Sequence, residues 1–386
     1  MTAPLRTFPG PVAGSSGAQR RYRRDDRLRR VYGVVTLPGG PAADLALGAP
    51  IGTSRLLERL LYLRNARAGR PLDRLGGKFG SSSSAEVTTV ELTFAAADAP
   101  VAFGHVERWL GDAPHEDDLA EARRLVAAES GGRADLAGRA LGQALRSLTN
   151  GRHFGALTDA DQLDRVPADL ARHQHRLLGL GWVTAAVGPG EGPWPGRDER
   201  GRWRPPSRPA SCHPGAAIES GPDTARAVVC AARALPGIGR RLDPVELASA
   251  VVDYGQALEA QQRLWSLVGP AKPVLHQRRY GSIGFLAVVA PAGPGRAGRV
   301  NDAVADLFQA LPETPPDQAR RRLIHQLELL IDTPRRWAAE EGLCALYGAP
   351  SPLDRLDYAR GCPDAELTDG LRLVAAAPAA TVTVRR

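Results

Sequence analysis

The segment GTSRLLERLLYL, residues 52–63, decides how the rest of this sequence is interpreted. Its leucines recur one, three and four positions apart, which predicts a helix with a broad apolar face. On such a helix Arg55, Glu58 and Arg59 share one face, because they stand at positions i, i+3 and i+4. The inverted zinc motif H-x-x-E-H has histidines at the first and last of these positions and glutamate between them. Here the glutamate is present, and arginine replaces both histidines.

Three segments that follow this helix carry patterns of their own. Gly76-Gly77 predict a turn and precede a serine run at 81–84. The stretch AEVTTVELTFA, residues 85–95, alternates apolar and polar side chains and predicts a strand. The segment EARRLVAAE, residues 121–129, lies in a helical pattern that opens with acidic residues, as helix N-termini favour. The order of these segments along the chain is more informative than any one of them.

In this order the segments resemble the pitrilysin/insulinase-type metallopeptidases, a family of inverzincins. Residues 52–63 resemble the family's G-x-x-H-L-L-E-H helix. Residues 76–95 resemble its Gly-Gly, small polar and Thr segment together with the strand that follows. Residues 121–129 resemble its E-R-x-x-V-x-x-E helix. The last glutamate of that helix, Glu129 here, is the third zinc ligand in active members of the family.

The resemblance extends over nearly the whole chain. NGRHFG at 150–155 resembles the family's x-H-P-Y-G segment, and residues 166–188 resemble the helix and strand that close its first domain. Residues 267–290 resemble a turn, helix and strand of its second domain, and residues 337–386 resemble the end of that domain. The match therefore includes segments from both halves of the chain.

The resemblance implies an α+β fold of two similar domains, each an antiparallel-rich mixed sheet covered by helices, which together form half of a clamshell. Apolar patterning agrees, because the order strand, helix, strand, helices, strand occurs twice and indicates a structural repeat. We expect a flexible basic arm over 1–28, an N-terminal pitrilysin-like domain over 29–188, a Pro/Gly/Arg-rich linker over 189–222 and a C-terminal pitrilysin-like domain over 223–386.

Periodicity also predicts the individual elements. Strands are expected at residues 29–37, 85–95, 182–188, 225–235, 284–290 and 381–386. Helices are expected at residues 53–63, 99–111, 117–130, 132–148, 166–178, 243–267, 300–310, 317–330 and 334–347. Thr53 or Ser54 is the expected N-cap of the first of these helices.

Arginine cannot replace a zinc-ligating histidine, because its guanidinium stays protonated and offers no lone pair. A catalytic zinc needs three neutral or anionic protein ligands and a water. We therefore expect no metal at the degenerate motif, which consists of Arg55, Glu58, Arg59 and Glu129. Without a metal-bound water the family's hydrolysis has no nucleophile there. Two interpretations of the arginines stay open: ion pairs with the two glutamates that replace the metal's charge, or ordinary surface ion pairs of small energy.

The other histidines are too scattered to form a second metal site. His173 and His175 stand two positions apart, so they lie on different faces of a helix, and we expect both to be solvated.

The composition excludes several function classes. Hydrophobic residues make up 43% of the 386 residues, which is enough for folded cores. No apolar run reaches the length of about 18 residues that a membrane span needs, and the N-terminus lacks the apolar core of a signal peptide. The four cysteines form no C-x-x-C pair, so reduced thiols in the cytoplasm are expected. The net charge of +8 comes from dispersed arginines without interleaved aromatics, which argues against nucleic-acid binding.

One set of candidate peptide-binding residues follows from the resemblance. Active members of the family hold the substrate with an arginine and a tyrosine of the second domain. Arg278 and Phe285 have this spacing, although phenylalanine lacks the hydroxyl group, and Arg279 is an alternative to Arg278.

A second candidate is the strand at 85–95, with Val87, Thr89 and Glu91. If it lies at a sheet edge, its main chain can pair with an extended peptide in a sequence-tolerant way. The alternative is an inner strand of the sheet with no contact to a peptide.

Members of the family that have lost the zinc motif typically accompany an active one. The leading hypothesis is a non-catalytic, pseudo-peptidase subunit of a heterodimeric zinc metallopeptidase. It would be inactive alone, complete the peptide-binding chamber and support a partner that bears H-x-x-E-H, holds the zinc and cleaves precursor or leader peptides. One alternative is a homodimeric binding or scaffold protein of the same fold without a proteolytic role, and another is a peptidase with an unrecognised site.

Overall fold

The computed structural model describes residues 18–131, 136–149, 170–193, 215–218, 226–253, 259–269, 272–281 and 283–385. Within these ranges the chain forms two compact units with one five-stranded sheet each. Unit 1 consists of Met1–Gly131, Thr158–Pro205 and Leu330–Ser351, and unit 2 consists of Gly132–Leu157, Pro206–Leu329 and Pro352–Arg386. Each unit therefore contains a segment from the other half of the chain. The predicted division into one domain over 29–188 and another over 223–386 is wrong in this respect.

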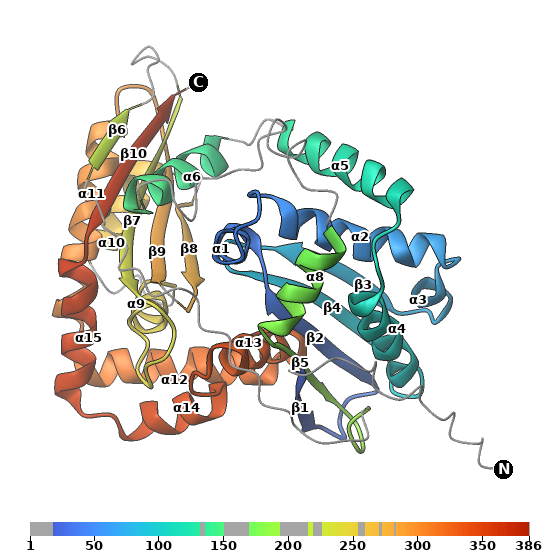
Figure 1. Ribbon diagram of the computed structural model, residues 1–386. Helices are drawn as coiled ribbons and strands as arrows, with labels where there is room; N and C mark the ends of the chain where they lie inside the picture. Colours follow the sequence, from blue (N-terminus) through green and yellow to red (C-terminus); the bar gives the residue numbers. More distant parts are fainter. Residues whose placement is uncertain are drawn as a thin grey trace. The chain divides into compact units, whose positions relative to one another are not determined.

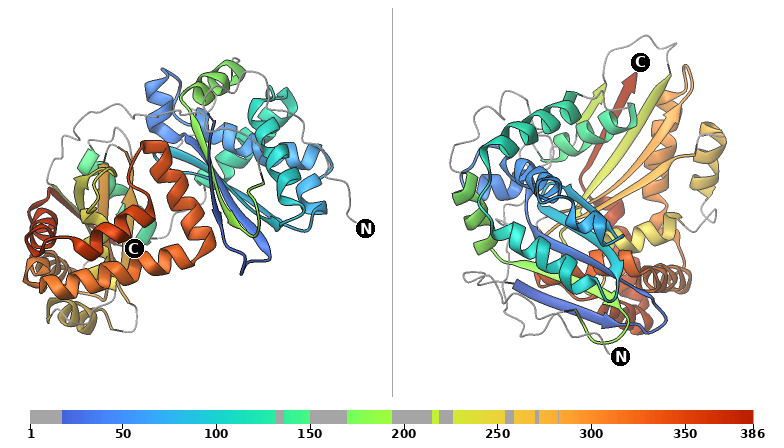
Figure 2. Two further views of the ribbon diagram at one scale, coloured as in Figure 1. Left: turned by 90° about the horizontal axis from the view of Figure 1, so that it is seen from below. Right: turned by 90° about the vertical axis from the view of Figure 1, so that its right-hand side faces the viewer.

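The sheet of unit 1 is mixed, with one parallel and three antiparallel pairings (Figure 1). Its strands lie in the order β1-β5-β2-β4-β3. Their bounds are β1 Ala18–Arg24, β2 Arg30–Pro38, β3 Lys78–Ser83, β4 Val87–Ala95 and β5 Trp182–Gly188. Strand β1 pairs in parallel with β5 and lies beside it in Figure 2, where β1 is dark blue and β5 is green. The central strand β2 places Val35 between Val90 of β4 and Thr184 of β5.

Helices cover both faces of this sheet. They are α1 Gly40–Ala46, α2 Thr53–Arg67, α3 Pro71–Arg74, α4 Ala99–Gly111, α5 Glu116–Gly131, α8 Leu170–Gly179 and α13 Pro334–Tyr347. Successive side chains of a strand point to opposite faces, so β2 contributes to two buried layers. Val35 packs in a cluster with Phe103 of α4. Thr36 faces α13, where a Cβ atom at Gly342 would lie 2.6 Å from its Oγ1, so glycine permits the close approach.

The sheet of unit 2 has the strand order β6-β10-β7-β9-β8. Its strands are β6 Gly215–Ile218, β7 Ala227–Pro236, β8 Val274–Arg279, β9 Ile283–Ala292 and β10 Ala379–Arg385. The helical elements of this part of the chain are α6 Leu136–Thr149, α9 Pro244–Asp253, α10 Glu259–Val268, α11 Ala297–Gln309, η1 Leu311–Glu313, α12 Pro316–Asp332, α14 Pro352–Gly361 and α15 Asp364–Ala376. Helix α6 packs against β7 and β10, so a helix from the first half of the chain covers this sheet.

The two sheets have the same topology. Adding five to each strand number in the first order produces the second order. The parallel pair of β1 with β5 corresponds to the parallel pair of β6 with β10. This identity confirms the predicted α+β class and the predicted structural repeat.

Two strands correct the sequence-based organisation. The predicted flexible arm over 1–28 contains β1, and the predicted linker over 189–222 contains β6. Neither AQRRYRR nor GAAI shows the alternating β-branched pattern of a half-buried strand. Both are outermost strands, which are held through main-chain pairing to one neighbour. Residues 1–17, 194–214 and 219–222 lie outside the described residues, as does the segment 150–155.

Most of the predicted helices and strands are confirmed within a few residues. The single helix expected over 243–267 is wrong, because this region contains two helices, α9 and α10. Strand β3 was not predicted, and the helix that the resemblance implied within residues 267–290 is wrong, because β8 lies there. Within the described chain no helix is long and apolar enough to cross a membrane. Cys230, Cys344 and Cys362 are buried free thiols, and Cys212 lies outside the described residues.

Candidate functional site

The degenerate motif lies on α2 of unit 1, and its glutamate is completely buried. Glu58 has no exposed surface. Its Oε2 lies 2.9 Å from Arg55 Nη1, and its Oε1 lies 3.3 Å from Arg59 Nη1. The hydroxyl of Ser81 on β3 donates a hydrogen bond to Glu58 Oε1 at 2.6 Å. A carboxylate loses its hydration when it is buried, so it is stable only with such partners. These are ion pairs of a buried group and not surface ion pairs.

The start of α2 is held by a residue of α1. Gly52 adopts φ 105°, in the left-handed region, and ends the loop before the helix. The Asp44 carboxylate accepts hydrogen bonds from Gly52 N at 2.8 Å and from Ser54 N at 2.9 Å. It also accepts one from Ser54 Oγ at 2.5 Å. The prediction that Thr53 or Ser54 caps the helix is therefore wrong, because the capping oxygen comes from Asp44.

The same carboxylate meets a buried histidine of α8. His173 is 5% exposed, and its Nε2 lies 3.4 Å from Asp44 Oδ1. The prediction that His173 is solvated is wrong, whereas His175 is exposed as predicted. The contacts of Asp44 thus connect α1, α2 and α8 near the start of α2.

Apolar contacts set the position of α2 against α5 and α8. Leu56 and Leu60 form a buried cluster with Ala122, Val126 and Leu170. Glu129 follows Val126 on α5, three residues further along the helix. The side chain of Glu129 lies outside the described part of the chain, so its pairing with the arginines stays a prediction.

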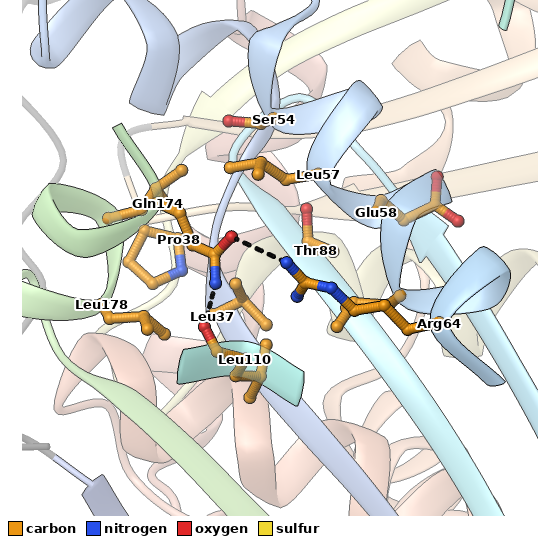
Figure 3. Close-up of a pocket in the computed structure, with 12 residues that line it drawn as sticks. Leu37, Pro38, Ser54, Leu57, Glu58, Arg64, Thr88, Leu110, Gln174 and Leu178 are labelled. Carbon is orange, nitrogen blue, oxygen red and sulfur yellow. Dashed lines mark hydrogen bonds between the residues drawn. The ribbon is translucent and has the colours of Figure 1, made fainter. Parts of the chain in front are cut away.

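A pocket (Figure 3) is lined by Ser54, Glu58 and Arg64 of α2 and by Leu110 and Gln174, and the side chains of Arg64 and Gln174 are engaged with the end of α4. Arg64 Nη2 donates to the Asp112 carbonyl at 2.6 Å, and Gln174 Nε2 donates to the same oxygen at 2.9 Å. Gln174 also donates to the Leu110 carbonyl. Burial lowers the pKa of Arg64, and the nearby Asp112 opposes this shift. In Figure 3 the Glu58 carboxylate points away from Gln174 and Leu110. These contacts satisfy terminal helix carbonyls and give the pocket a structural role.

The side chains of the motif do not fit zinc. Two protonated guanidinium groups flank the only carboxylate described there, and neither offers a lone pair. Across the described residues, no group of three or more His, Cys, Asp or Glu side chains is arranged to hold a metal ion. No catalytic step through a metal follows from this arrangement.

In unit 2, strands β8 and β9 place Arg278 opposite Phe285. The Arg278 side chain is exposed, and its Nη1 donates to the Gln277 carbonyl at 2.9 Å. Phe285 is 1% exposed and packs edge-on against Tyr280, with ring centroids 6.5 Å apart. A substrate-binding role for Arg278 and Phe285 stays a prediction. The burial of Phe285 argues against direct contact between this side chain and a substrate.

Arg279 belongs to a buried ionic cluster. Its Nε lies 2.7 Å from Asp243 Oδ2, and its Nη1 lies 3.5 Å from Glu246 Oε1. Arg355 Nη1 lies 2.9 Å from Glu246 Oε2. The cluster connects β8, α9 and α14, and only 8% of the Arg279 side chain is exposed. We therefore interpret Arg279 as a structural residue.

The candidate strand with Val87, Thr89 and Glu91 is not a sheet edge. It is β4, which pairs with β2 on one side and with β3 on the other. The expected strand addition at these residues is therefore wrong, since no main-chain edge of β4 is open. Glu91 accepts a hydrogen bond from Arg335 Nε at 2.7 Å. Among the described strands the outermost one on this side is β3.

The sequence interpretation missed β3 because KFGSSS has few strand-forming side chains. The signal that would have revealed it lies in the partner strand. Ser82 and Ser83 face Thr89 and Thr88, and each pair of hydroxyl oxygens is 2.8 Å apart. A serine run followed by a threonine pair can thus indicate two antiparallel strands whose hydroxyl groups form hydrogen bonds across the pair.

The fold as a whole is similar to those of solved M16-like peptidases. A protease from Helicobacter pylori is 14% identical with a TM-score of 0.75, over 97% of this chain and 98% of that chain. The peptidase M16 inactive domain from Pseudomonas fluorescens is 15% identical with a TM-score of 0.73, over 96% and 95%. A chain of complex III2 from Candida albicans, solved with Inz-5 bound, is 11% identical with a TM-score of 0.71, over 95% and 93%.

In sequence alone, no known protein-family profile and no curated protein matches this chain. The structural similarity shows the fold: two similar α+β domains of the pitrilysin type, in a chain whose zinc motif is degenerate. This confirms the fold that the resemblance implied. Identities of 11–15% carry no activity, substrate or partner to this chain.

Proposed function

We propose that this protein is a non-catalytic, peptide-binding subunit that works with a catalytic zinc peptidase of the same fold. The buried ion-pair cluster of Arg55, Glu58 and Arg59 carries the proposal. It stands at the positions that the resemblance assigns to a zinc motif and has ion pairs with a buried carboxylate in place of metal ligands. An M16-like fold with such a site can hold a peptide, although it has no metal-bound water with which to cleave one.

The peptide-binding element of this proposal is β3. Its outer side is the open edge of the unit 1 sheet among the described strands, and an extended peptide can add there through main-chain hydrogen bonds. Ser81 of β3 bonds to Glu58, so the edge lies directly beside the degenerate motif. The partner would supply H-x-x-E-H and the zinc, and precursor or leader peptides are the proposed substrates.

A reconstitution experiment tests the proposal. The full chain is purified alone and together with an M16-like protein that carries an intact H-x-x-E-H and is encoded beside it. We expect no cleavage of an unfolded casein probe by the single chain, and chelator-sensitive cleavage by the pair. The proposal fails if the two proteins do not associate, or if the single chain cleaves the probe and the chelator stops it.

Metal content gives a second, independent measurement. We expect the single chain to contain no stoichiometric zinc after incubation with excess zinc and gel filtration, because arginine is not a ligand. One zinc per chain that is lost in an Arg55→Ala or Glu129→Gln variant would contradict the assignment of a non-catalytic subunit.

A further inference from the structure

The further inference concerns the residues of a peptide that pair with the edge of β3, and it rests on the proposed function. Strand β3 alternates between exposed and half-buried positions. Ser81 belongs to the half-buried set, and its hydroxyl reaches Glu58 on α2. Lys78, Gly80 and Ser82 are exposed, and they share the opposite face because alternate side chains of a strand point the same way.

No contact among the described residues requires a glycine at position 80. A Cβ atom built on Gly80 meets no heavy atom of the described chain within 4 Å, and its φ lies outside the left-handed region. Gly77 differs, because a Cβ atom there would collide with the ring of Phe94. Glycine inside a strand weakens it and often marks a place where a ligand or another chain approaches closely. The edge therefore has room at Gly80 for a side chain that a peptide supplies.

The next exposed position on this face carries a lysine. Lys78 lies opposite Thr93 of β4, and within the described chain its ammonium group has no ion pair. Glu91 of β4 lies opposite Gly80 and is already engaged, since its carboxylate accepts a hydrogen bond from Arg335 Nε at 2.7 Å. A carboxylate on an added strand opposite Lys78 would complement the charge of this lysine.

We infer that the edge of β3 selects peptides with an acidic residue opposite Lys78 and an aromatic residue opposite Gly80. A peptide strand added there continues the pleat at a spacing of about 4.8 Å, so these two side chains stand on the exposed face, two positions apart. The acidic residue supplies the counter-charge, and the ring covers the bare main chain of the glycine. The aliphatic stem of Lys78 can pack against the ring while its ammonium group meets the carboxylate.

The order of the two residues depends on the direction of the peptide. Strand β3 runs from Lys78 to Gly80 and pairs with β4 in the antiparallel direction. Antiparallel pairing is slightly more stable per residue than parallel pairing, so we expect the peptide to run antiparallel to β3. Its sequence then has the aromatic residue first and the acidic residue two positions later.

The test measures binding of end-blocked synthetic peptides to the full-length chain by calorimetry. The parent peptide is Thr-Thr-Phe-Thr-Glu-Thr. Three others replace Phe with Leu, replace Glu with Gln, or have the parent sequence reversed. We expect each of the three to bind at least about threefold more weakly than the parent, and the effect of Glu to shrink at high salt. Tighter binding of the reversed peptide would overturn the antiparallel register.

Two variants and two controls make the test specific. Gly80→Thr fills the open position with a strand-forming residue, so it should unfold at the same or a higher temperature and lose the preference for Phe over Leu. Lys78→Gln should lose the preference for Glu over Gln and keep the preference for Phe. Gly298→Ala, at an exposed glycine of α11 with open space around it, and Lys272→Gln should keep both preferences.

The lysine content of the chain allows the bound peptide to be located. Lys78 and Lys272 are the only two lysines. Reductive methylation with carbon-13 formaldehyde labels both side chains and keeps their charge. The Lys78→Gln and Lys272→Gln variants assign the two NMR signals. We expect the parent peptide to shift the signal of Lys78 and to leave that of Lys272 unchanged.

The outcomes separate the two proposals. If the peptides shift the Lys78 signal but bind with equal affinity, or if Gly80→Thr and Lys78→Gln keep both preferences, the inferred selection is wrong and peptide binding at β3 stands. If no peptide binds, or if bound peptide leaves the Lys78 signal unchanged, the peptide-binding edge itself is wrong.

Discussion

At the scale of single residues, the exchange of histidine for arginine changes what kind of group can lie beside Glu58. A histidine pair presents lone pairs to a cation, whereas an arginine pair presents cations to an anion. The buried carboxylate of Glu58 is then the counter-charge that makes two arginines tolerable on one helix face. Relative to the zinc motif that the resemblance implies, the electrostatics at these positions are reversed.

Removing this carboxylate is predicted to destabilise unit 1. Glu58→Ala leaves two guanidinium groups facing an empty site, and we expect a loss of about 3 kcal/mol in the free energy of unfolding. Urea denaturation followed by circular dichroism measures it. Glu121→Ala is the control, since the exposed pair of Glu121 with Arg124 should contribute less than about 1 kcal/mol. Equal effects of the two substitutions would show that burial of Glu58 contributes nothing.

A second residue-scale prediction concerns pH. Burial raises the pKa of the Cys230 thiol to about 12, whereas an unfolded cysteine ionises near about pH 8.5. Between these values the unfolded chain releases a proton that the folded chain keeps, so the stability falls as the pH rises. Cys230→Ala should flatten this alkaline fall in urea denaturation under reducing conditions. Parallel curves for wild type and variant would contradict it.

The residue scale also shows where sequence interpretation stops. Arg55, Glu58 and Arg59 could be placed on one face, because helical spacing is a local property. Asp44 and Ser81 could not be connected to α2, because the loop and turn that bring them there are set by packing. The solvated state predicted for His173 failed for the same reason, since its partner on α1 is far away in sequence.

At the scale of elements, outer strands explain most of the prediction errors. Inner strands such as β5 are buried on both faces and are rich in apolar side chains, so periodicity finds them. The outer strands β1, β3 and β6 are polar or composed of small residues. Charged and polar side chains on an edge also discourage aggregation, so their weak strand signal has a physical benefit.

The cap of α2 yields a prediction at this scale. Asp44→Ala removes three hydrogen bonds at the helix start, and Asp44→Asn keeps an acceptor oxygen. We expect Asp44→Ala to cost about 2 kcal/mol and Asp44→Asn to recover part of it. Thermal unfolding of both variants measures this. If Asp44→Asn is as damaging as Asp44→Ala, the contact with His173 is the dominant one.

At the scale of the whole molecule, the two units have the same sheet topology, and each unit contains a helix from the other half of the chain. Each sheet has the same strand order. Helix α13, from the second half of the chain, buries Trp337 and Leu346 in unit 1, and α6, from the first half, buries Leu145 and Leu148 in unit 2. The periodic patterns identified both helices correctly. The patterns could not assign α6 and α13 to a unit, because the periodicity of a helix does not indicate which sheet its apolar face packs against.

This exchange predicts that the halves depend on each other. Residues 1–205 expressed alone lack α13, so the sheet face of β2 and β5 is uncovered. We expect this fragment to bind a hydrophobic dye and to lose the sharp thermal transition of the full chain. Co-expression with residues 206–386 should restore neither unit fully, because the covering helices α6 and α13 must then dock without the covalent connection. A fragment 1–205 that melts cooperatively by itself would contradict the prediction.

The position of α13 in the chain also orders events during synthesis. Ribosomes add about 5–20 residues per second, and N-terminal domains usually fold first. Unit 1 needs Leu330–Ser351, which the ribosome makes long after β5 ends at Gly188, so the sheet face of β2 and β5 stays uncovered until then. The exposed face would wait for its cover while the residues between β5 and α13 are made, and a chaperone that shields β2 and β5 would act on the nascent chain in this interval.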